Sequence, residues 1–226
     1  MPAFALVTEG ITDQVLVESL VTTILEDEYG IEVDINVLQP LLDETDNARQ
    51  KKESFGGFEK VLDYCSDQEK IQDALAFNNY LIIQIDTDSC EHPAFGLNLY
   101  RDGSELSPRE LVTDVTNLLI SRISTQFYSQ YNNRIIFAIT VHSTECWLLP
   151  FYNTKGTCKT KNCQQHLNNE LNKQNISYNK DGPIYRKLCK PALKLKNIDA
   201  AARYNSNLGD FIGHLKSFAP FQVTIT

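Results

Sequence analysis

Apolar residues in this chain gather in four short runs, and longer amphipathic segments separate them. Three of the runs are almost continuously apolar, which is typical of strands buried on both faces. In the remaining run apolar residues alternate with charged or amide residues, which predicts a strand with one face in solvent. The four predicted strands are Ala3–Thr8, Ile31–Val37, Tyr80–Ile85 and Arg134–Val141.

The segments between these strands have apolar residues at helical spacing. One helix has a strong start signal, because Ser107, Pro108 and Glu110 suit the N-cap, first and third helical positions. Alternating strands and helices predict an α/β fold, with a mostly parallel four-stranded sheet and helices on both faces. The predicted helices are Thr12–Glu28, Phe58–Phe77, Ser107–Gln126, a short turn after His142, and a closing helix at Asn207–Ser217.

Composition places the chain among ordinary globular proteins. It has 226 residues, of which 42% are hydrophobic, enough to build a substantial core. No apolar run approaches the length of a membrane span, and the first ten residues lack the basic start of a signal peptide. We therefore expect a cytoplasmic protein without membrane contact, whose six cysteines are thiols.

Charge is distributed unevenly along the chain. Residues 1–90 carry 19 acidic and 5 basic residues, whereas residues 151–226 carry 4 acidic and 12 basic residues. Such asymmetry indicates one region that binds cations and another that meets anions. Composition also changes after Pro150, towards Asn, Lys and Cys. We therefore divide the chain into a first domain, 1–150, and a basic C-terminal extension of mixed helices and loops, 151–226, packed on it.

Acidic residues follow the predicted strands at the ends where parallel α/β sheets bind ligands. Glu9 ends the first strand, Asp86 and Asp88 follow the third, and Glu145 comes shortly after the fourth. Asp13 lies in the first turn of the first helix. Carboxylates gathered at one edge repel each other unless a cation neutralises them. Oxygen ligands of this kind suit Mg²⁺ or Mn²⁺, ions that serve phosphoryl chemistry.

Structural explanations for some of these residues stay open. Asp13 would also favour the positive N-terminus of a helix. A D-x-D pair is common by chance, but its place directly after a buried strand favours a functional role for Asp86 and Asp88. A zinc site is a further alternative, with irregular C-x4-C-x2-H spacing. Its ligands would be Cys158, Cys163, His166 and Cys189.

Several of these motifs resemble the Toprim (topoisomerase–primase) fold, in the branch of small OLD-like (overcoming-lysogenization-defect) nucleases. TEGITD, with Glu9, Gly10 and Asp13, resembles the first acidic motif of that branch, and Asp86-x-Asp88 resembles the second. SFGGFEKVL resembles the glycine turn before the second helix. STECWLLP and the C-terminal NIDAAARYNSNLGDFIGHL also resemble segments of small stand-alone members.

The resemblance implies a metal-dependent nuclease that hydrolyses phosphodiesters of DNA or RNA. It implies that Glu9 is a metal ligand or a general acid/base, and that Asp86 and Asp88 are metal ligands. It further implies that Asp13 helps to hold a second metal and that Glu145 contributes from the fourth strand. The catalytic set would thus be Glu9, Asp86, Asp88 and Glu145, and residues 1–150 would be a Toprim-like, metal-binding catalytic domain.

The resemblance also implies a partner. OLD-like nucleases usually work with an ABC-type ATPase, and several such pairs serve antiphage defence. This chain has no G-x-x-x-x-G-K-[ST] phosphate loop, so the ATPase would be a separate chain. Self-association into a homo-oligomer is the alternative. The long polar segment Gln39–Ser54 is a candidate docking or gating loop.

The basic stretch Lys155–Arg203 is the candidate nucleic-acid surface. It has 11 Lys and Arg residues, with Tyr178, Tyr185 and Tyr204 among them. Basic side chains neutralise phosphates and tyrosine rings stack on unpaired bases. OLD-like nucleases often carry a basic residue that stabilises the scissile phosphate, and the motifs here contain none. The substrate-binding candidates, chosen by charge, are Lys190, Lys194 and Lys196.

Other functions fit parts of the pattern. A haloacid-dehalogenase-like phosphatase also has a D-x-D after a strand, but its nucleophile lies early in the chain and Asp86 lies late. A D-x-D glycosyltransferase would leave Glu9-Gly10 unexplained. A non-catalytic Toprim-like interaction or sensor subunit is the non-enzyme alternative, although the intact acidic residues argue against simple loss of activity.

Overall fold

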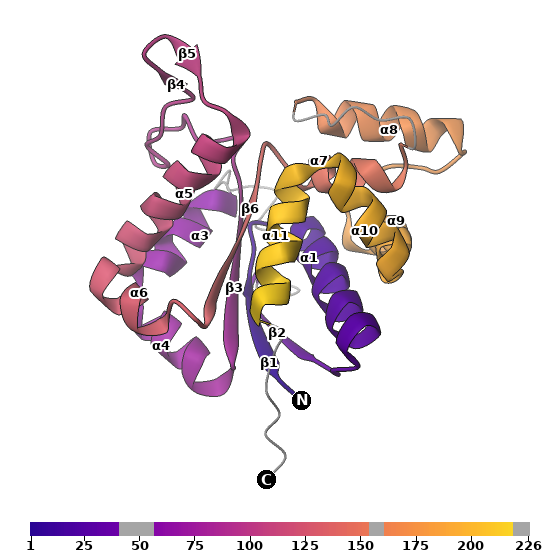
Figure 1. Cartoon of the computed structure of the whole chain (residues 1–226). Helices are drawn as coiled ribbons and strands as arrows, with labels where there is room; N and C mark the ends of the chain where they lie inside the picture. The colour runs from indigo at the N-terminus through magenta and orange to yellow at the C-terminus, as the bar shows by residue number, and fades with distance from the viewer. Residues whose placement is uncertain (41–56, 154–160, 219–226) are drawn as a thin grey trace.

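The computed structural model describes residues 1–40, 57–153 and 161–218. Four parallel strands form the central sheet in the order β2-β1-β3-β6 (Figure 1). The predicted α/β class with a parallel four-stranded sheet is therefore confirmed. The strands are β1 (Ala3–Val7), β2 (Asp34–Gln39), β3 (Tyr80–Asp86) and β6 (Ile135–Thr140).

One face of the sheet is covered by four helices, on the left of Figure 1. The segment Phe58–Phe77, predicted as one helix, forms two, because Asp67 caps a new helix by accepting a hydrogen bond from the backbone N–H of Lys70 at 3.1 Å. The capping box of Ser107 and Glu110 is confirmed. These helices are α3 (Gly57–Ser66), α4 (Gln68–Phe77), α5 (Pro108–Ile123) and α6 (Thr125–Tyr131).

The opposite face is covered by α1 (Ile11–Thr23) and the predicted closing helix, α11 (Ser206–Phe218). The last part of the predicted first helix is a π-helix, η1 (Ile24–Glu28). The short turn after His142 is α7 (Thr144–Leu148), followed by η2 (Leu149–Phe151). Trp147 of α7 stacks on Phe211 of α11 with ring centroids 5.0 Å apart, which joins the C-terminal helix to the core.

The described residues after Pro150 are mostly helical, whereas the sequence predicted a mixture of helices and loops. It contains α8 (Cys163–Lys173), α9 (Gly182–Leu188), η3 (Lys190–Leu193) and α10 (Leu195–Tyr204). Leu167, Tyr185 and Ile198 from these helices are buried in the same hydrophobic core as β1 and α1. The basic region thus completes the core on this face of the sheet.

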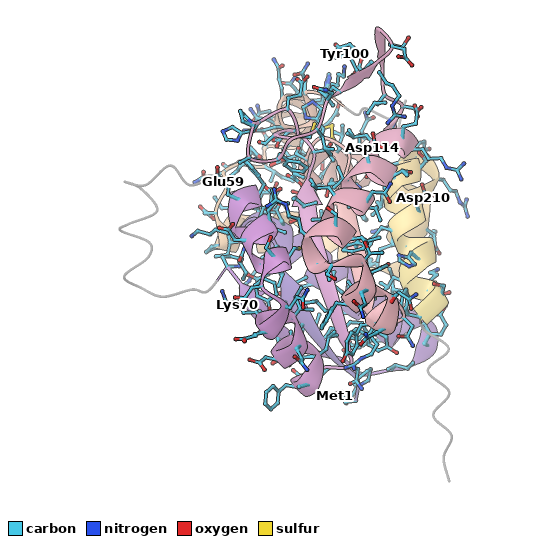
Figure 2. All side chains as sticks on the ribbon, turned by 90° about the vertical axis from the view of Figure 1, so that its left-hand side faces the viewer. Met1, Glu59, Lys70, Tyr100, Asp114 and Asp210 are labelled. Carbon is cyan, nitrogen blue, oxygen red and sulfur yellow. A yellow bond between two sulfur atoms is a disulfide. The ribbon has the colours of Figure 1, made fainter. Side chains whose placement is uncertain are left out.

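Two strand details differ from the prediction. Strand β2 begins at Asp34, whose N–H bonds to the carbonyl of Pro2, and runs past Val37 to Gln39. A small hairpin that was not predicted, β4 (Tyr100–Arg101) and β5 (Ser104–Glu105), projects from the top of the molecule (Figures 1 and 2). Of the predicted loop Gln39–Ser54, residues 41–54 lie outside the described residues. Among the helices described, none is long and apolar enough to cross a bilayer.

Candidate functional site: an acidic edge and Lys180

The first and third strands are joined at their carboxyl ends by acidic side chains. Glu9 Oε1 accepts a hydrogen bond from the backbone N–H of Asp86 at 2.6 Å. Gln84, fully buried in β3, accepts from the backbone N–H of Glu9 at 3.1 Å and donates to Asp86 Oδ1 at 2.8 Å. Gln84 was not predicted as part of the site, although a glutamine within the apolar run YLIIQI was a visible signal.

Gly57, the first residue of α3, packs directly against Glu9. A Cβ at position 57 would lie 2.5 Å from the carbonyl oxygen of Glu9 and 3.0 Å from its Cβ. A Cβ does not approach a carbonyl oxygen this closely in real proteins, so only glycine permits the contact. The positive N-terminal end of α3 therefore lies beside the acidic residue that ends β1. This contact gives a physical reason for the second glycine in SFGGFEKVL.

Asp13 lies in the first turn of α1 and is buried. Its Oδ1 accepts a hydrogen bond from the Thr144 hydroxyl at 2.5 Å, so α1 and α7 meet at this carboxyl group. Burial raises the pKa of Asp13 to about 6, the Thr144 hydrogen bond opposes the rise, and the charge of Glu145 adds to it. The carboxyl group therefore lies close to a second acidic group.

The pKa values show that the acidic side chains act on each other. Burial raises the pKa of Glu9 to about 8, and the charges of Asp13 and Asp88 add to that rise. Burial also raises the pKa of Asp86 well above its usual value, and the charges of Asp13 and Glu9 raise it further. The carboxyl groups thus lie close together without enough positive charge nearby to keep all of them ionised.

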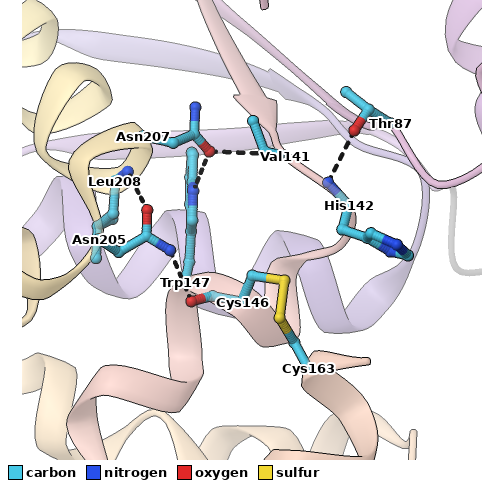
Figure 3. Close-up of a disulfide and its surroundings, with 9 residues drawn as sticks. All are labelled: Thr87, Val141, His142, Cys146, Trp147, Cys163, Asn205, Asn207 and Leu208. Atoms are coloured by element: carbon cyan, nitrogen blue, oxygen red, sulfur yellow. Dashed lines mark hydrogen bonds between the residues drawn. A yellow bond between two sulfur atoms is a disulfide. The ribbon is translucent and has the colours of Figure 1, made fainter. Parts of the chain in front are cut away.

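Asp88 differs from its neighbours because it is exposed. It lies in the turn after β3, where its backbone N–H bonds to the carbonyl of His142 at 3.0 Å. The hydroxyl of Thr87 accepts a hydrogen bond from the N–H of His142 at 2.8 Å (Figure 3). These bonds tie the turn after β3 to the turn after β6 and leave the Asp88 carboxylate open to solvent.

Among the described residues, Glu145 is the only one of these carboxyl groups that contacts two hydroxyl donors and a lysine amine. Its Oε1 accepts hydrogen bonds from Tyr178 at 2.9 Å and Tyr185 at 2.8 Å, and lies 2.9 Å from Lys180 Nζ. Burial would raise its pKa, but hydrogen bonding from Ser143 and the charge of Lys180 outweigh burial and lower it to about 2. Glu145 is therefore ionised and anchored in the core, 1% exposed.

Among the described residues, Lys180 is the basic residue that pairs with the acidic edge, the group formed by Glu9, Asp13, Asp86, Asp88 and Glu145. It was not among the lysines predicted from the sequence. Its side chain is half exposed. Burial lowers the pKa of Lys180, but the charges of Glu145, Asp13 and Asp86 outweigh burial, so the pKa is raised overall. The predicted candidates Lys190, Lys194 and Lys196 are exposed on η3 and α10 or between them. Over the described residues they make no ion pair with the acidic edge, and their predicted role in substrate binding stays a prediction.

Glu145 is positioned by a network that fixes α7. Asn207 Oδ1 accepts hydrogen bonds from the Val141 N–H at 3.0 Å and from Trp147 Nε1 at 2.7 Å (Figure 3). Asn205 donates to the carbonyl of Cys146 at 2.8 Å. Two asparagines at the start of the C-terminal helix therefore hold the turn after β6 and the helix that carries Glu145.

A disulfide joins Cys146 of α7 to Cys163, the first residue of α8 (Figure 3). The expectation of six thiols is therefore wrong for these two residues. The zinc alternative is also wrong as a four-ligand set, because the sulfur of Cys163 is bonded to Cys146. Cys158 lies outside the described residues, and Cys65, Cys90 and Cys189 are buried free thiols.

A cavity of about 450 Å³ opens beside the acidic edge. Asp88, Glu145 and Lys180 line one part of it, and side chains from the start of α8 line another. Its volume falls within the range of about 300–1,000 Å³ that small-molecule sites occupy. A ligand of moderate size can thus reach Asp88, Glu145 and Lys180, whereas Glu9, Asp13 and Asp86 do not line this cavity.

The acidic edge fits a hard divalent cation in its chemistry. Its donors are carboxylate oxygens, and those of Glu9, Asp13 and Asp86 have pKa values raised by burial and by their neighbours. Across residues 1–40, 57–153 and 161–218, no three His, Cys, Asp or Glu side chains already converge as ligands of one ion. Glu9 and Asp86 instead bond to protein groups, so they would have to turn towards a cation to hold it.

Comparison of the chain with protein-family models, with curated proteins and with solved structures finds no match in any of the three.

Proposed function

We propose that this chain is a divalent-metal-dependent nuclease that hydrolyses phosphodiester bonds of DNA or RNA. The observation that supports it best is the gathering of Glu9, Asp13 and Asp86 at one sheet edge, with pKa values raised by burial and mutual repulsion. Carboxyl groups held in this way gain stability when a cation joins them. The motif resemblance to OLD-like Toprim nucleases points to the same chemistry.

The surroundings of each residue indicate its proposed role. Mg²⁺ or Mn²⁺ would stabilise the charge that develops on the phosphodiester oxygens. The ligands of the cation would be Glu9, Asp13, Asp86, Asp88 and, if it leaves Lys180, Glu145. Lys180, half exposed at the cavity, attracts the substrate phosphate. Glu9, with a pKa of about 8, exchanges a proton near neutral pH and suits a general acid/base when no cation holds it ionised.

The basic C-terminal region is the proposed surface for nucleic acid outside the cavity. Lys190, Lys194 and Lys196 are exposed there and free to meet phosphates. Replacing all three with alanine should weaken binding to duplex DNA and reduce the slope of log affinity against log salt by about 0.9 for each lost phosphate contact. An unchanged slope would place the nucleic acid on another surface.

The proposed cellular role is that of a cytoplasmic antiphage effector working with a separate ATPase. The support is the motif resemblance together with the strongly acidic first 90 residues, which would steer a basic partner. The purified chain alone should then be nearly inactive, or self-associated. Full activity of the isolated monomer would contradict the partner, while leaving the nuclease proposal intact.

The deciding experiment is a cleavage assay on single- and double-stranded DNA and RNA and on tRNA, with Mg²⁺ or Mn²⁺, with and without the product of the neighbouring gene. Glu9→Gln and Asp86→Asn should each reduce cleavage at least a hundredfold. Glu26→Gln is the matched control, because Glu26 is exposed on η1, away from the sheet edge. Equal cleavage by all variants would show that the active site lies elsewhere.

One observation favours a second candidate, a non-catalytic interaction or sensor subunit. Glu145 already pairs with Lys180 and accepts hydrogen bonds from two tyrosines, and Asp86 accepts a hydrogen bond from Gln84. Such a subunit would cleave nothing in the assay above, yet would bind its ATPase. Including p-nitrophenyl phosphate as a substrate tests the remaining alternative, a D-x-D phosphatase.

A further inference from the structure

The cavity beside the acidic edge has a second wall of a different chemical kind. Carboxamide side chains from the first two turns of α8 line it: Gln164, Gln165 and Asn168. Residues 164 and 168 are four apart and residues 165 and 168 are three apart, so these side chains lie on one side of the helix. They span about 6 Å along the helix axis, comparable to the width of a nucleobase.

This wall carries no formal charge at neutral pH. From Cys163 to Asn169 the helix has no Lys, Arg, Asp or Glu, although most of its side chains there are at least partly exposed. Another part of the cavity lining is highly charged, with Asp88, Glu145 and Lys180. A ligand that matches both parts has a charged group at one end and a neutral group rich in hydrogen-bonding atoms at the other.

The three amides are available for such a ligand. Within the described part of the chain, their side chains make no hydrogen bond to a protein group. Each amide offers a carbonyl acceptor and two N–H donors on one plane. Asn and Gln use this pair of groups to bind the edges of nucleobases, most often adenine.

Tyr178 gives the cavity an aromatic surface beside the amides. Its hydroxyl donates to Glu145 at 2.9 Å, which fixes the ring, and the half-buried ring lines the cavity. A tyrosine held in this way is a platform on which an unpaired base can stack.

The amide wall is held firmly to the rest of the molecule. Leu167 and Leu171 of α8 are buried in the core, and the disulfide to Cys146 anchors its first turn. The amide wall and Glu145 therefore hold fixed positions relative to each other, because Cys146 directly follows Glu145.

We propose that this cavity binds the base of an unpaired nucleotide, with Gln164, Gln165 and Asn168 of α8 recognising its edge while the nucleotide's phosphate lies at Lys180 and the acidic residues. This inference rests on the proposed nuclease function and adds to it a substrate class, single-stranded nucleic acid, with base preference near the cut. A base in a duplex has its pairing edge occupied, and so would not fit the amide wall in this way.

The test uses the full chain labelled with ¹⁵N, so that the side-chain NH₂ signals of glutamine and asparagine report binding. The probes are the four 5′-mononucleotides and ribose 5-phosphate, each titrated with and without Mg²⁺. At least one nucleotide should bind at least about tenfold more tightly than ribose 5-phosphate, because one well-placed amide–base pair contributes that much affinity. The double variant Gln165→Ala/Asn168→Ala should remove that advantage and leave ribose 5-phosphate binding unchanged.

Asn169→Ala is the matched control, because Asn169 is an exposed asparagine of the same helix that does not line the cavity. It should retain the preference for nucleotides. The inference is overturned if no nucleotide binds more tightly than ribose 5-phosphate, or if the double variant keeps the preference.

The Mg²⁺ arms separate this inference from the proposed function. Ribose 5-phosphate binding that requires Mg²⁺, with no added affinity from any base, refutes the base pocket while supporting the metal site. A base preference that is the same with and without Mg²⁺, in a protein that cleaves nothing even with the product of the neighbouring gene, supports the pocket and refutes the nuclease.

Discussion

The carboxylate of Glu9 accepts a hydrogen bond from the backbone N–H of Asp86 at 2.6 Å, across 77 positions of the sequence. This contact joins the end of β1 to the end of β3, so the two acidic motifs form one structural unit. It also partly stabilises the ionised form of Glu9, against burial and the neighbouring charges that raise its pKa to about 8. The stability of the acidic edge and its affinity for a cation both depend on that balance.

Replacing Gly57 with alanine should disturb the acidic edge. The new Cβ would lie 2.5 Å from the Glu9 carbonyl oxygen, so either α3 or the end of β1 must move. We expect a loss of about 1–3 kcal/mol in the free energy of unfolding, the range for overpacked sites, and weaker Mn²⁺ binding. Urea unfolding and Mn²⁺ titration measure the two effects.

Gly213→Ala is the control for this variant. Gly213 lies within α11, and a Cβ added there would meet nothing within 4 Å, so alanine should be neutral or stabilise the helix by up to about 1 kcal/mol. If both variants behave alike, the close approach of Gly57 to Glu9 has no structural importance.

The metal-free protein should lose stability as pH rises. Glu9 has a folded-state pKa of about 8 against 4.5 ordinarily, and Asp13 about 6 against 3.8. A carboxyl group with a raised pKa favours folding fully below its ordinary pKa, and this contribution is lost as pH rises through the folded-state value. The decline should therefore run from about pH 4 to about pH 8.

Urea unfolding in EDTA at several pH values measures that decline. Glu9→Gln should reduce the decline, most clearly between pH 6 and pH 8, since glutamine does not titrate, whereas Glu26→Gln should leave the profile unchanged. Stability that increases across this range would show that the carboxyl groups are not held as the structure has them.

Removing the Lys180 amine should destabilise the protein, because it leaves the buried charge of Glu145 with only neutral hydrogen-bond donors. Loss of one partner of a fully buried pair costs about 3–5 kcal/mol, but Lys180 is half exposed, so we expect about 1–2 kcal/mol for Lys180→Met. Lys187→Met, at an exposed position of α9, should cost less than about 0.5 kcal/mol. Equal unfolding free energies for the two variants would contradict the pairing of Lys180 with Glu145.

Reduction of the disulfide should lower stability. Cys146 and Cys163 are 17 residues apart, and closing a loop of this size stabilises a protein by about 3 kcal/mol in the chain-entropy model. Urea unfolding with and without dithiothreitol measures the loss, and the variant Cys146→Ala/Cys163→Ala should not respond to the reductant. Six free thiols in the unreduced, purified protein would contradict the disulfide.

The sequence predicts those parts of the fold that depend on local pattern. The apolar runs of β3 and β6 and the capping box of Ser107 are properties of adjacent residues, and the structure confirms them. The gathering of Glu9, Asp13 and Asp86 could be predicted because parallel strands bring their carboxyl ends to one edge. The break at Asp67 was missed because the apolar spacing continues through it, although aspartate is itself a good N-cap.

Features that depend on distant residues could not be predicted in the same way. Lys180 precedes α9 in a region of weak periodicity, and only the tertiary fold brings it to Glu145, 35 residues earlier. The pairing of Cys146 with Cys163 likewise depends on where α8 packs. Choosing lysines by local charge density pointed instead to Lys190, Lys194 and Lys196, which lie on an exposed surface.

The central claim is that the acidic edge binds a divalent cation. Isothermal titration of the unmodified chain with Mn²⁺ at pH 8, compared with Asp86→Asn and Glu26→Gln, tests it most directly. We predict saturable binding that is weakened at least tenfold by Asp86→Asn and unchanged by Glu26→Gln. No saturable binding, or equal affinity in all three proteins, would contradict the claim.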